Sequence, residues 1–177
     1  MATTKWVVDP THSEIGFKVK HMMFTNVSGK IQKFDASIEA EDDEFNNARI
    51  EFSGDIDSIS TGNADRDKDL LSADFFNVEE TPKITFKSNS FTKTGNGEYD
   101  LVGDLTLHGV TKQVNFVTEF GGLMADPWGN TKAAFSINGK INRKDWGLNW
   151  NAALEAGGVL VSEEVRLAIE LQFIKQA

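Results

Sequence analysis

The sequence of 177 residues contains no cysteine. This absence excludes disulfide bonds, cysteine nucleophiles and metal sites built from thiolates. Basic residues are also scarce, because 18 lysines and arginines stand against 27 aspartates and glutamates, for a net charge of -9. No cluster of basic residues offsets that charge, so we expect no nucleic-acid partner.

Long apolar runs are missing as well. No run approaches the roughly 20 residues that a membrane-spanning helix needs, so we expect no membrane span. Met1 is not followed by a basic stretch and an apolar one, and the sequence as written therefore predicts no signal peptide. We expect a cytoplasmic protein, or an exported one from which a leader was removed. The length suits a single domain over residues 1–177.

Two features of the sequence stand out: many phenylalanines, and apolar side chains at every second position. The sequence has 13 phenylalanines against 4 tryptophans and 1 tyrosine, which indicates a large apolar interior. Apolar side chains alternate with polar ones, as in antiparallel strands with one wet and one dry face. The alternating segments are Trp6–Val8, Ile15–Val19, Ile31–Ile38, Ile50–Ile56, Ile84–Phe86, Tyr99–Leu107, Val114–Phe120, Phe135–Ile141 and Val165–Phe173.

This spacing predicts an all-β sandwich or barrel, and the long strands with inward glycines favour closure into an antiparallel β-barrel of about eight strands. Gly54, Gly103 and Gly139 fall on the dry face, where a strand either bends sharply or admits a bulky neighbour. A barrel of this size is filled by its own side chains or holds one small ligand. The alternation alone does not distinguish these two possibilities.

Two segments interrupt the alternation. Ser60–Pro82 begins with N-cap residue types and acids and ends at a proline, which predicts one or two short helices capping a barrel mouth. Asn142–Gly158 predicts a long loop with a helical turn. The first of these segments also places aspartates at 65, 67 and 69, as a calcium loop does. Leu70 and Phe76 then stand where an EF-hand requires glycine and glutamate, so the helix start is favoured.

Groups suited to catalysis are sparse. The three histidines, His12, His21 and His108, lie too far apart for a local metal-ligand spacing, and we expect neither metal nor other cofactor. No GxSxG turn presents a serine nucleophile. His108 precedes Gly109 between two alternating segments, so "HGVTK" predicts a hairpin connection in which Gly109 adopts a backbone conformation that other residues resist.

Four blocks of the sequence resemble, in order, the blocks of the YceI-like family. They are "VDPTHSEIGFKVKHMMFTNVSGKI", "DSISTGNADRDKDLLSADFFNVEETPKITFKS", "DLTLHGVTKQV" and "INRKDWGLNWNAALEAGGVLVSEEV". The resemblance implies an extended lipocalin-like barrel whose apolar lumen binds a long isoprenoid or related lipid. Proteins of the family are best understood as binders or carriers rather than enzymes. Many are exported to the bacterial periplasm, which is the address expected here if a leader was removed.

Site residues follow from the resemblance together with the dry face. The expected apolar lining is Phe17, Val19, Phe52, Ile56, Leu70, Leu71, Phe75, Phe76, Phe86, Leu105, Leu107, Phe116, Phe135, Ile137, Trp146 and Leu167. Polar candidates for the mouth are His21, Arg66, Arg143 and Asn149. For the two arginines the alternative is a salt bridge to a nearby acid, such as Asp67 or Asp145.

Three functions stay open at this point. The first is a carrier of an isoprenoid lipid or quinone tail. The second is an enzyme acting on a barrel-bound lipid, with His21 or His108 as the acid or base. The third is a filled barrel that serves as an interaction scaffold, with an exposed apolar patch. A homodimer is one assembly compatible with the sequence.

Overall fold

The computed structural model describes residues 3–21, 25–42, 44–45, 47–62, 67, 82–148 and 163–176. The elements of this part are eleven strands, all paired antiparallel in one sheet, and three short 3₁₀ turns. Most of the alternating segments predicted from the sequence coincide with these strands.

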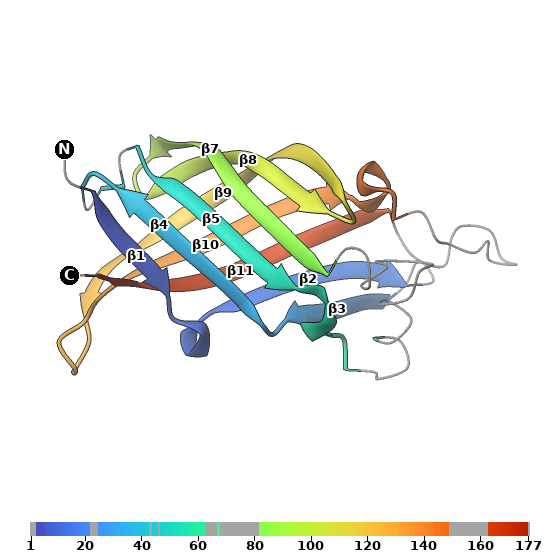
Figure 1. Ribbon diagram of the computed structural model, residues 1–177, viewed down its shortest axis with the longest axis horizontal. Helices are drawn as coiled ribbons and strands as arrows, with labels where there is room; N and C mark the ends of the chain where they lie inside the picture. Colours follow the sequence, from blue (N-terminus) through green and yellow to red (C-terminus); the bar gives the residue numbers. More distant parts are fainter. Residues whose placement is uncertain are drawn as a thin grey trace, which may run out of the picture.

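Eight strands close into a barrel, which confirms the predicted fold (Figure 1). Neighbours pair in the order β1–β4–β5–β7–β8–β9–β10–β11, and β11 pairs back with β1. The strands are β1 (Thr4–Val8), β4 (Phe34–Ala40), β5 (Arg49–Asp55), β7 (Lys83–Gly95), β8 (Glu98–Leu107), β9 (Val110–Ala125), β10 (Thr131–Asn142) and β11 (Glu164–Lys175).

Three further strands continue the same sheet beyond the closed ring of eight strands. They are β2 (Glu14–His21), β3 (Thr25–Ile31) and β6 (Ile59–Ser60), which we call the side sheet. β11 pairs with β1 near its C-terminal end, at Phe173, and with β2 nearer its start, from Glu170 to Arg166. β1 and β2 are thus two parts of one interrupted strand, and so are the pairs β3/β4 and β5/β6. Figure 1 shows the side sheet running toward the end opposite the two chain termini.

Hydrogen bonds fix the interruption between β1 and β2. The 3₁₀ turn η1 (Pro10–His12) separates the two strands and leaves a gap in the ladder along β11. The backbone N–H of Asp9 donates to the carbonyl of Gln172 (2.8 Å), and the N–H of Gln172 donates to Ser13 Oγ (2.9 Å). Buried backbone groups are satisfied in this way although the chain turns.

A second interruption corrects the strand predicted over Ile31–Ile38. The chain leaves β3 at Ile31 and enters β4 at Phe34, beside the 3₁₀ turn η2 (Ile56–Ser58). The buried Ser58 connects the break between β3 and β4 with the break between β5 and β6. Its Oγ accepts the N–H of Lys33 (2.9 Å) and donates to the carbonyl of Asp55 (2.6 Å). The alternation shifts by one residue at this break, because the polar residues Gln32 and Lys33 follow one another between Ile31 and Phe34, and the predicted strand overlooked this shift.

The predicted hairpin at His108 is confirmed and is shorter than expected. β8 and β9 are joined by only two residues, with Leu107 opposite Val110. His108 and Gly109 have φ values of 54° and 73°, so both adopt the left-handed conformation of a type I′ turn. Gly109 was expected to do so, whereas His108 was not.

Aromatic side chains fill the barrel at the end that holds the termini. The rings of Trp6, Phe45, Phe120 and Phe135 lie within this cluster, with neighbouring centroids between 5.0 and 5.3 Å apart. Such tilted and edge-on contacts are favourable ring geometries. This end is therefore a packed core.

Parts of the two irregular segments lie outside the described residues. Of the helices expected in Ser60–Pro82, residues 63–66 and 68–81 are not described. The helical turn expected after Asn142 is present as η3 (Arg143–Trp146), and residues 149–158 of that loop are not described. In the described ranges, no helix has the length and apolar character needed to cross a membrane.

Candidate ligand chamber

Burial changes along the inner face of the barrel. On β11 the inward side chains Phe173 and Leu171 are 1% and 6% exposed, whereas Ile169, Leu167 and Val165 are only partly buried. These residues alternate on one strand, so they share one face. The inner face is therefore buried near the termini and only partly buried toward the side sheet.

Two neighbouring strands show the same trend. On β10 burial decreases from Ala133 to Ile141, and on β2 it decreases from Ile15 to Val19. We call the interior space at this end the chamber. Its described walls carry the partly buried inward side chains Phe17, Val19, Ile141, Leu167 and Ile169.

Phenylalanine rings lie over three glycines of the inner face, which is the second of the two possibilities that the sequence left open. A Cβ atom added at Gly54 would lie 3.1 Å from a ring carbon of Phe52. At Gly103 the distance to a ring carbon of Phe86 would be 2.5 Å, and at Gly139 the distance to Cε1 of Phe116 would be 2.7 Å. Each ring thus occupies the space that a side chain would need. Rings placed flat against the wall add apolar surface without projecting across the interior.

Two of these rings form a continuous aromatic surface. Phe86 on β7 and Phe116 on β9 are stacked, with centroids 6.1 Å apart and planes inclined by 29°. Phe86 lies over β8 and Phe116 over β10, so the pair covers part of four neighbouring strands. Both rings are buried, so the pair belongs to the packed interior beside the chamber.

A buried arginine lies in η3, next to the chamber end of β10. Arg143 is 1% exposed, and its guanidinium donates to the carbonyl of Leu148 at 2.5 Å. Burial lowers the pKa of Arg143, while the charge of Glu163 opposes that shift. Because arginine stays protonated in proteins, the site holds a buried positive charge. Asp145, one partner suggested by the sequence, is exposed.

Hydrogen bonds attach η3 to the β8–β9 hairpin. Trp146 Nε1 donates to the carbonyl of Leu105 (3.0 Å), and His108 Nδ1 lies 3.1 Å from the carbonyl of Trp146. The histidine that resembles a catalytic group in the sequence therefore fastens a turn. This contact also gives a reason for its left-handed backbone.

The structure separates the expected lining residues into three groups. Those buried are Ile56, Phe86, Leu105, Leu107, Phe116, Phe135, Ile137 and Trp146. Those partly buried are Phe17, Val19, Phe52 and Leu167. Leu70, Leu71, Phe75, Phe76, Arg66, Asn149 and the side chain of His21 lie outside the described residues. The lining and mouth assignments therefore stay predictions.

Two residues of the chamber wall were not selected from the sequence. Ile141 and Ile169 continue the dry faces of their strands, and alternation could have identified them. Gly29 was also overlooked, although the Phe17 ring lies over it. Its strand, "TNVSGKI", alternates from Val27 to Ile31 and places Gly29 on the dry face, so alternation could have identified the glycine. Its ring partner follows only from the pairing of β2 with β3.

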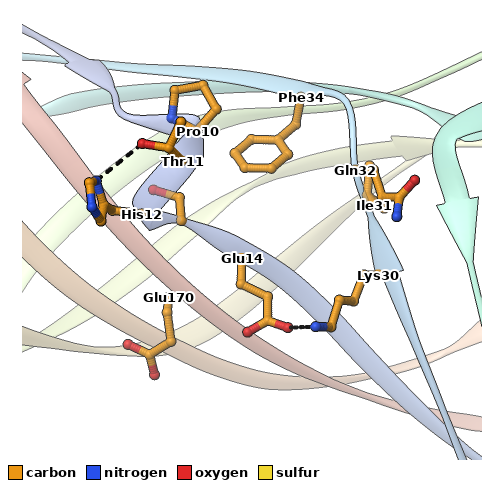
Figure 2. A pocket seen from close by; sticks show the side chains of 10 residues that line it. Pro10, Thr11, His12, Glu14, Lys30, Ile31, Gln32, Phe34 and Glu170 are labelled. Carbon is orange, nitrogen blue, oxygen red and sulfur yellow. Dashed lines mark hydrogen bonds and ion pairs between the residues drawn. The ribbon is translucent and has the colours of Figure 1, made fainter.

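An open pocket of about 470 Å³ lies at the strand interruptions (Figure 2). Its charged side chains already have partners: Glu14 pairs with Lys30 at 2.6 Å, and His12 Nδ1 lies 2.8 Å from Asp9 Oδ2. Glu170 accepts a hydrogen bond from Ser136. We therefore do not assign the ligand site here. In the described part of the chain, no three histidine, aspartate or glutamate side chains gather as metal ligands.

Exposed apolar residues gather elsewhere, on β9 and the turn that follows it. Trp128 is 80% exposed, and Val117, Leu123 and Met124 are exposed nearby in the sequence. Asp126 Oδ1 accepts the backbone N–H groups of Trp128 and Asn130, both at 2.9 Å. The hydrogen bond from Asn130 lowers the pKa of Asp126, so this turn is held by a carboxylate.

Comparison with known proteins agrees with this architecture. The YceI-like domain profile matches residues 6–173. A UPF0312 protein of Staphylococcus aureus is 36% identical over 171 residues, which are 96% of this chain and 97% of that protein.

Solved structures share the fold. BcnA of Burkholderia cenocepacia superimposes with a TM-score of 0.81 at 20% identity, over 93% of this chain and 98% of that one. A YCEI protein of Campylobacter jejuni gives 0.77 at 29% identity, over 89% and 90%. A polyisoprenoid-binding domain from Saccharophagus degradans gives 0.72 at 16% identity, over 97% and 98%. With the profile spanning nearly the whole barrel, the chain belongs to the YceI-like family.

Proposed function

We propose that this protein binds a long apolar lipid of the isoprenoid type inside the barrel and acts as a binding or carrier protein. The observation that carries the proposal is the apolar and only partly buried inner face at the side-sheet end. Leu167, Ile169 and Phe17 present apolar surface there that the described side chains do not cover. The Saccharophagus degradans domain, named for polyisoprenoid binding, has the same fold and supports this ligand class.

Apolar burial alone is sufficient to favour a long chain. Burying one CH₂ group stabilises by about 0.8 kcal/mol, so one five-carbon isoprene unit contributes roughly 3–4 kcal/mol. Association costs about 4–15 kcal/mol of lost freedom before any net affinity remains. A ligand of several units is therefore needed, and affinity is expected to rise with chain length until the chamber is full.

Extraction of the purified protein with organic solvent, followed by mass spectrometry, tests the proposal. We expect a co-purified lipid with a prenyl chain. Titration of the delipidated protein with prenyl alcohols of increasing length checks the dependence on length by calorimetry. Failure to extract any lipid, together with no binding at any chain length, would contradict the proposal.

The buried charge of Arg143 suggests how a polar head group is held. Arg143 follows the chamber end of β10 directly, two residues after the partly buried Ile141. A cation in a poorly hydrated position interacts strongly with an anionic or carbonyl group. Replacing Arg143 with Met should weaken binding of a prenyl phosphate more than binding of the matching prenyl alcohol. Equal losses for both ligands would show that the charge does not contact the head group.

Docking of another protein is a second candidate function, favoured by the exposed Trp128 and Met124. Large exposed apolar residues on a rigid turn are typical of interaction sites. Sedimentation velocity over a concentration series tests one form of it, self-association. A dimer that Trp128→Ser abolishes would support this function, and a monomer at every concentration would exclude self-association through this turn.

A further inference from the structure

Two phenylalanine rings at the chamber lie over glycines of adjacent strands. A Cβ atom at Gly29 of β3 would lie 2.8 Å from both Cε atoms of Phe17 and closer still to its Cζ. A Cβ atom at Gly139 of β10 would lie 2.7 Å from Cε1 of Phe116 and closer to its Cδ1. Real Cβ contacts do not come this close, so each ring keeps its position only because a glycine faces it.

The strand register places both contacts in one transverse row of the wall. Leu167 of β11 is opposite Phe17 on one side and opposite Gly139 on the other, and Phe17 is opposite Gly29. The row crosses β3, β2, β11 and β10. Phe17 and Leu167 are only partly buried, so this row borders the uncovered part of the interior.

We propose that Gly29 and Gly139 set the width of the chamber and so allow it to accept a methyl-branched isoprenoid chain. An isoprenoid chain carries a methyl group on every fourth carbon of its backbone and is wider than a straight saturated chain. The two glycines let the rings lie flat, which leaves room for the branches. This inference rests on the proposed lipid-binding function and names the feature that selects between lipid classes.

The surroundings predict that a methyl group at Gly29 displaces a ring and leaves the backbone in place. The three nearest atoms to its Cβ position all belong to the outer part of the Phe17 ring. Two other glycines differ: a Cβ at Gly103 on the inner face would lie 2.6 Å from the backbone oxygen of Lys87, and one at Gly16 on the outer face would lie 2.9 Å from that of Ala168. A ring end moves more easily than a strand. Gly29→Ala should therefore push Phe17 into the chamber with little loss of stability.

The test compares two ligands on three proteins. The ligands are a prenyl alcohol of four isoprene units and a straight saturated alcohol with the same number of backbone carbons. The proteins are the delipidated wild type, Gly29→Ala, and the control Gly121→Ala, whose added Cβ would meet Ala134 at an ordinary 3.4 Å. Excluding one or two branch methyl groups should weaken prenyl binding by about tenfold in Gly29→Ala. Straight-chain binding should change by less than about threefold, and the control should match the wild type.

The outcomes separate this inference from the function on which it rests. A wild type that binds neither ligand contradicts the proposed function. A wild type that binds the prenyl alcohol while Gly29→Ala binds it equally well overturns the width argument, and so does an equal loss of both ligands. If Gly29→Ala does not fold, Phe17→Leu tests the width argument by removing the ring instead of displacing it. By widening the chamber it should raise the preference for the branched chain, and an unchanged preference would overturn the inference.

Discussion

Thr118 carries a buried hydroxyl group that should make the protein less stable than it need be. Its side chain is 1% exposed, lies on the inner face of β9, and faces Tyr99 and Ile137 on the neighbouring strands. In the described structure, Oγ1 has no hydrogen-bond partner. Thr118→Val replaces this hydroxyl with a methyl group of nearly the same size, and we expect it to stabilise the fold.

The magnitude follows from two contributions. Burying a hydroxyl group without a partner costs about 1–3 kcal/mol in proteins, and this cost disappears in the variant. The new methyl group adds up to about 0.8 kcal/mol of apolar burial, partly offset by imperfect packing. The free energy of unfolding should therefore rise by about 2 kcal/mol. In a domain of this size, that corresponds to roughly 4–8 °C in Tm.

Urea unfolding and a thermal scan measure the effect, and an unchanged m-value would show that only stability differs. Thr106→Val on β8 is the matched control, because the Oγ1 atoms of Thr106 and Thr111 already share a hydrogen bond of 2.7 Å. The control should show no gain. A Thr118→Val protein that unfolds at lower urea than the wild type would refute the reasoning, because the hydroxyl must then have a partner.

Three further predictions concern the strand interruptions and the two ends of the barrel. The hydrogen bond from Lys132 (2.9 Å) lowers the pKa of Asp9, so Asp9→Asn should cost about 2 kcal/mol at pH 7. This stabilisation exists above the unfolded pKa near 3.9 and is lost as pH falls through the lower folded value, so urea midpoints of variant and wild type should converge below about pH 4. Ser58→Ala should cost about 1–3 kcal/mol by urea unfolding, because it leaves the N–H of Lys33 without its partner, and an unchanged midpoint would contradict this. Phe135→Ala should cost about 3–5 kcal/mol and Leu167→Ala clearly less, and equal losses on thermal unfolding would show that both ends are packed alike.

The strands could be predicted because alternation is a local property of the sequence. The interruption between β3 and β4 was overlooked, although the dry face shifts by one residue between Ile31 and Phe34. The contact of Ser58 that fixes it spans 25 residues and has no local signal. The left-handed backbone of His108 escaped prediction for a similar reason. Its partner, Trp146, lies 38 residues further along the chain. Contacts between distant segments leave no signature in a single alternating run.

For the candidate site, the inner face could be predicted from local alternation, but the contacts between distant strands could not. Alternation assigned Phe135 and Leu167 to one inner face, and both lie on it. It could not distinguish the packed core around Phe135 from the chamber around Leu167, because that difference depends on where β1 closes against β11. For Gly139 the sequence predicted either a sharp bend or a bulky neighbour, and a ring lies over it. Gly29 shares the dry face of its own strand but was overlooked, and its ring partner is fixed by register.

The forked pairing of β11 explains how one sheet provides both a stable core and a chamber. Its C-terminal part pairs with β1 and completes the closed ring of eight strands around the aromatic cluster. Its earlier part pairs with β2, and there the wall continues as the side sheet instead of closing around a packed interior. Folding free energy is concentrated where rings contact one another. At the other end, the described inward side chains are apolar and only partly buried.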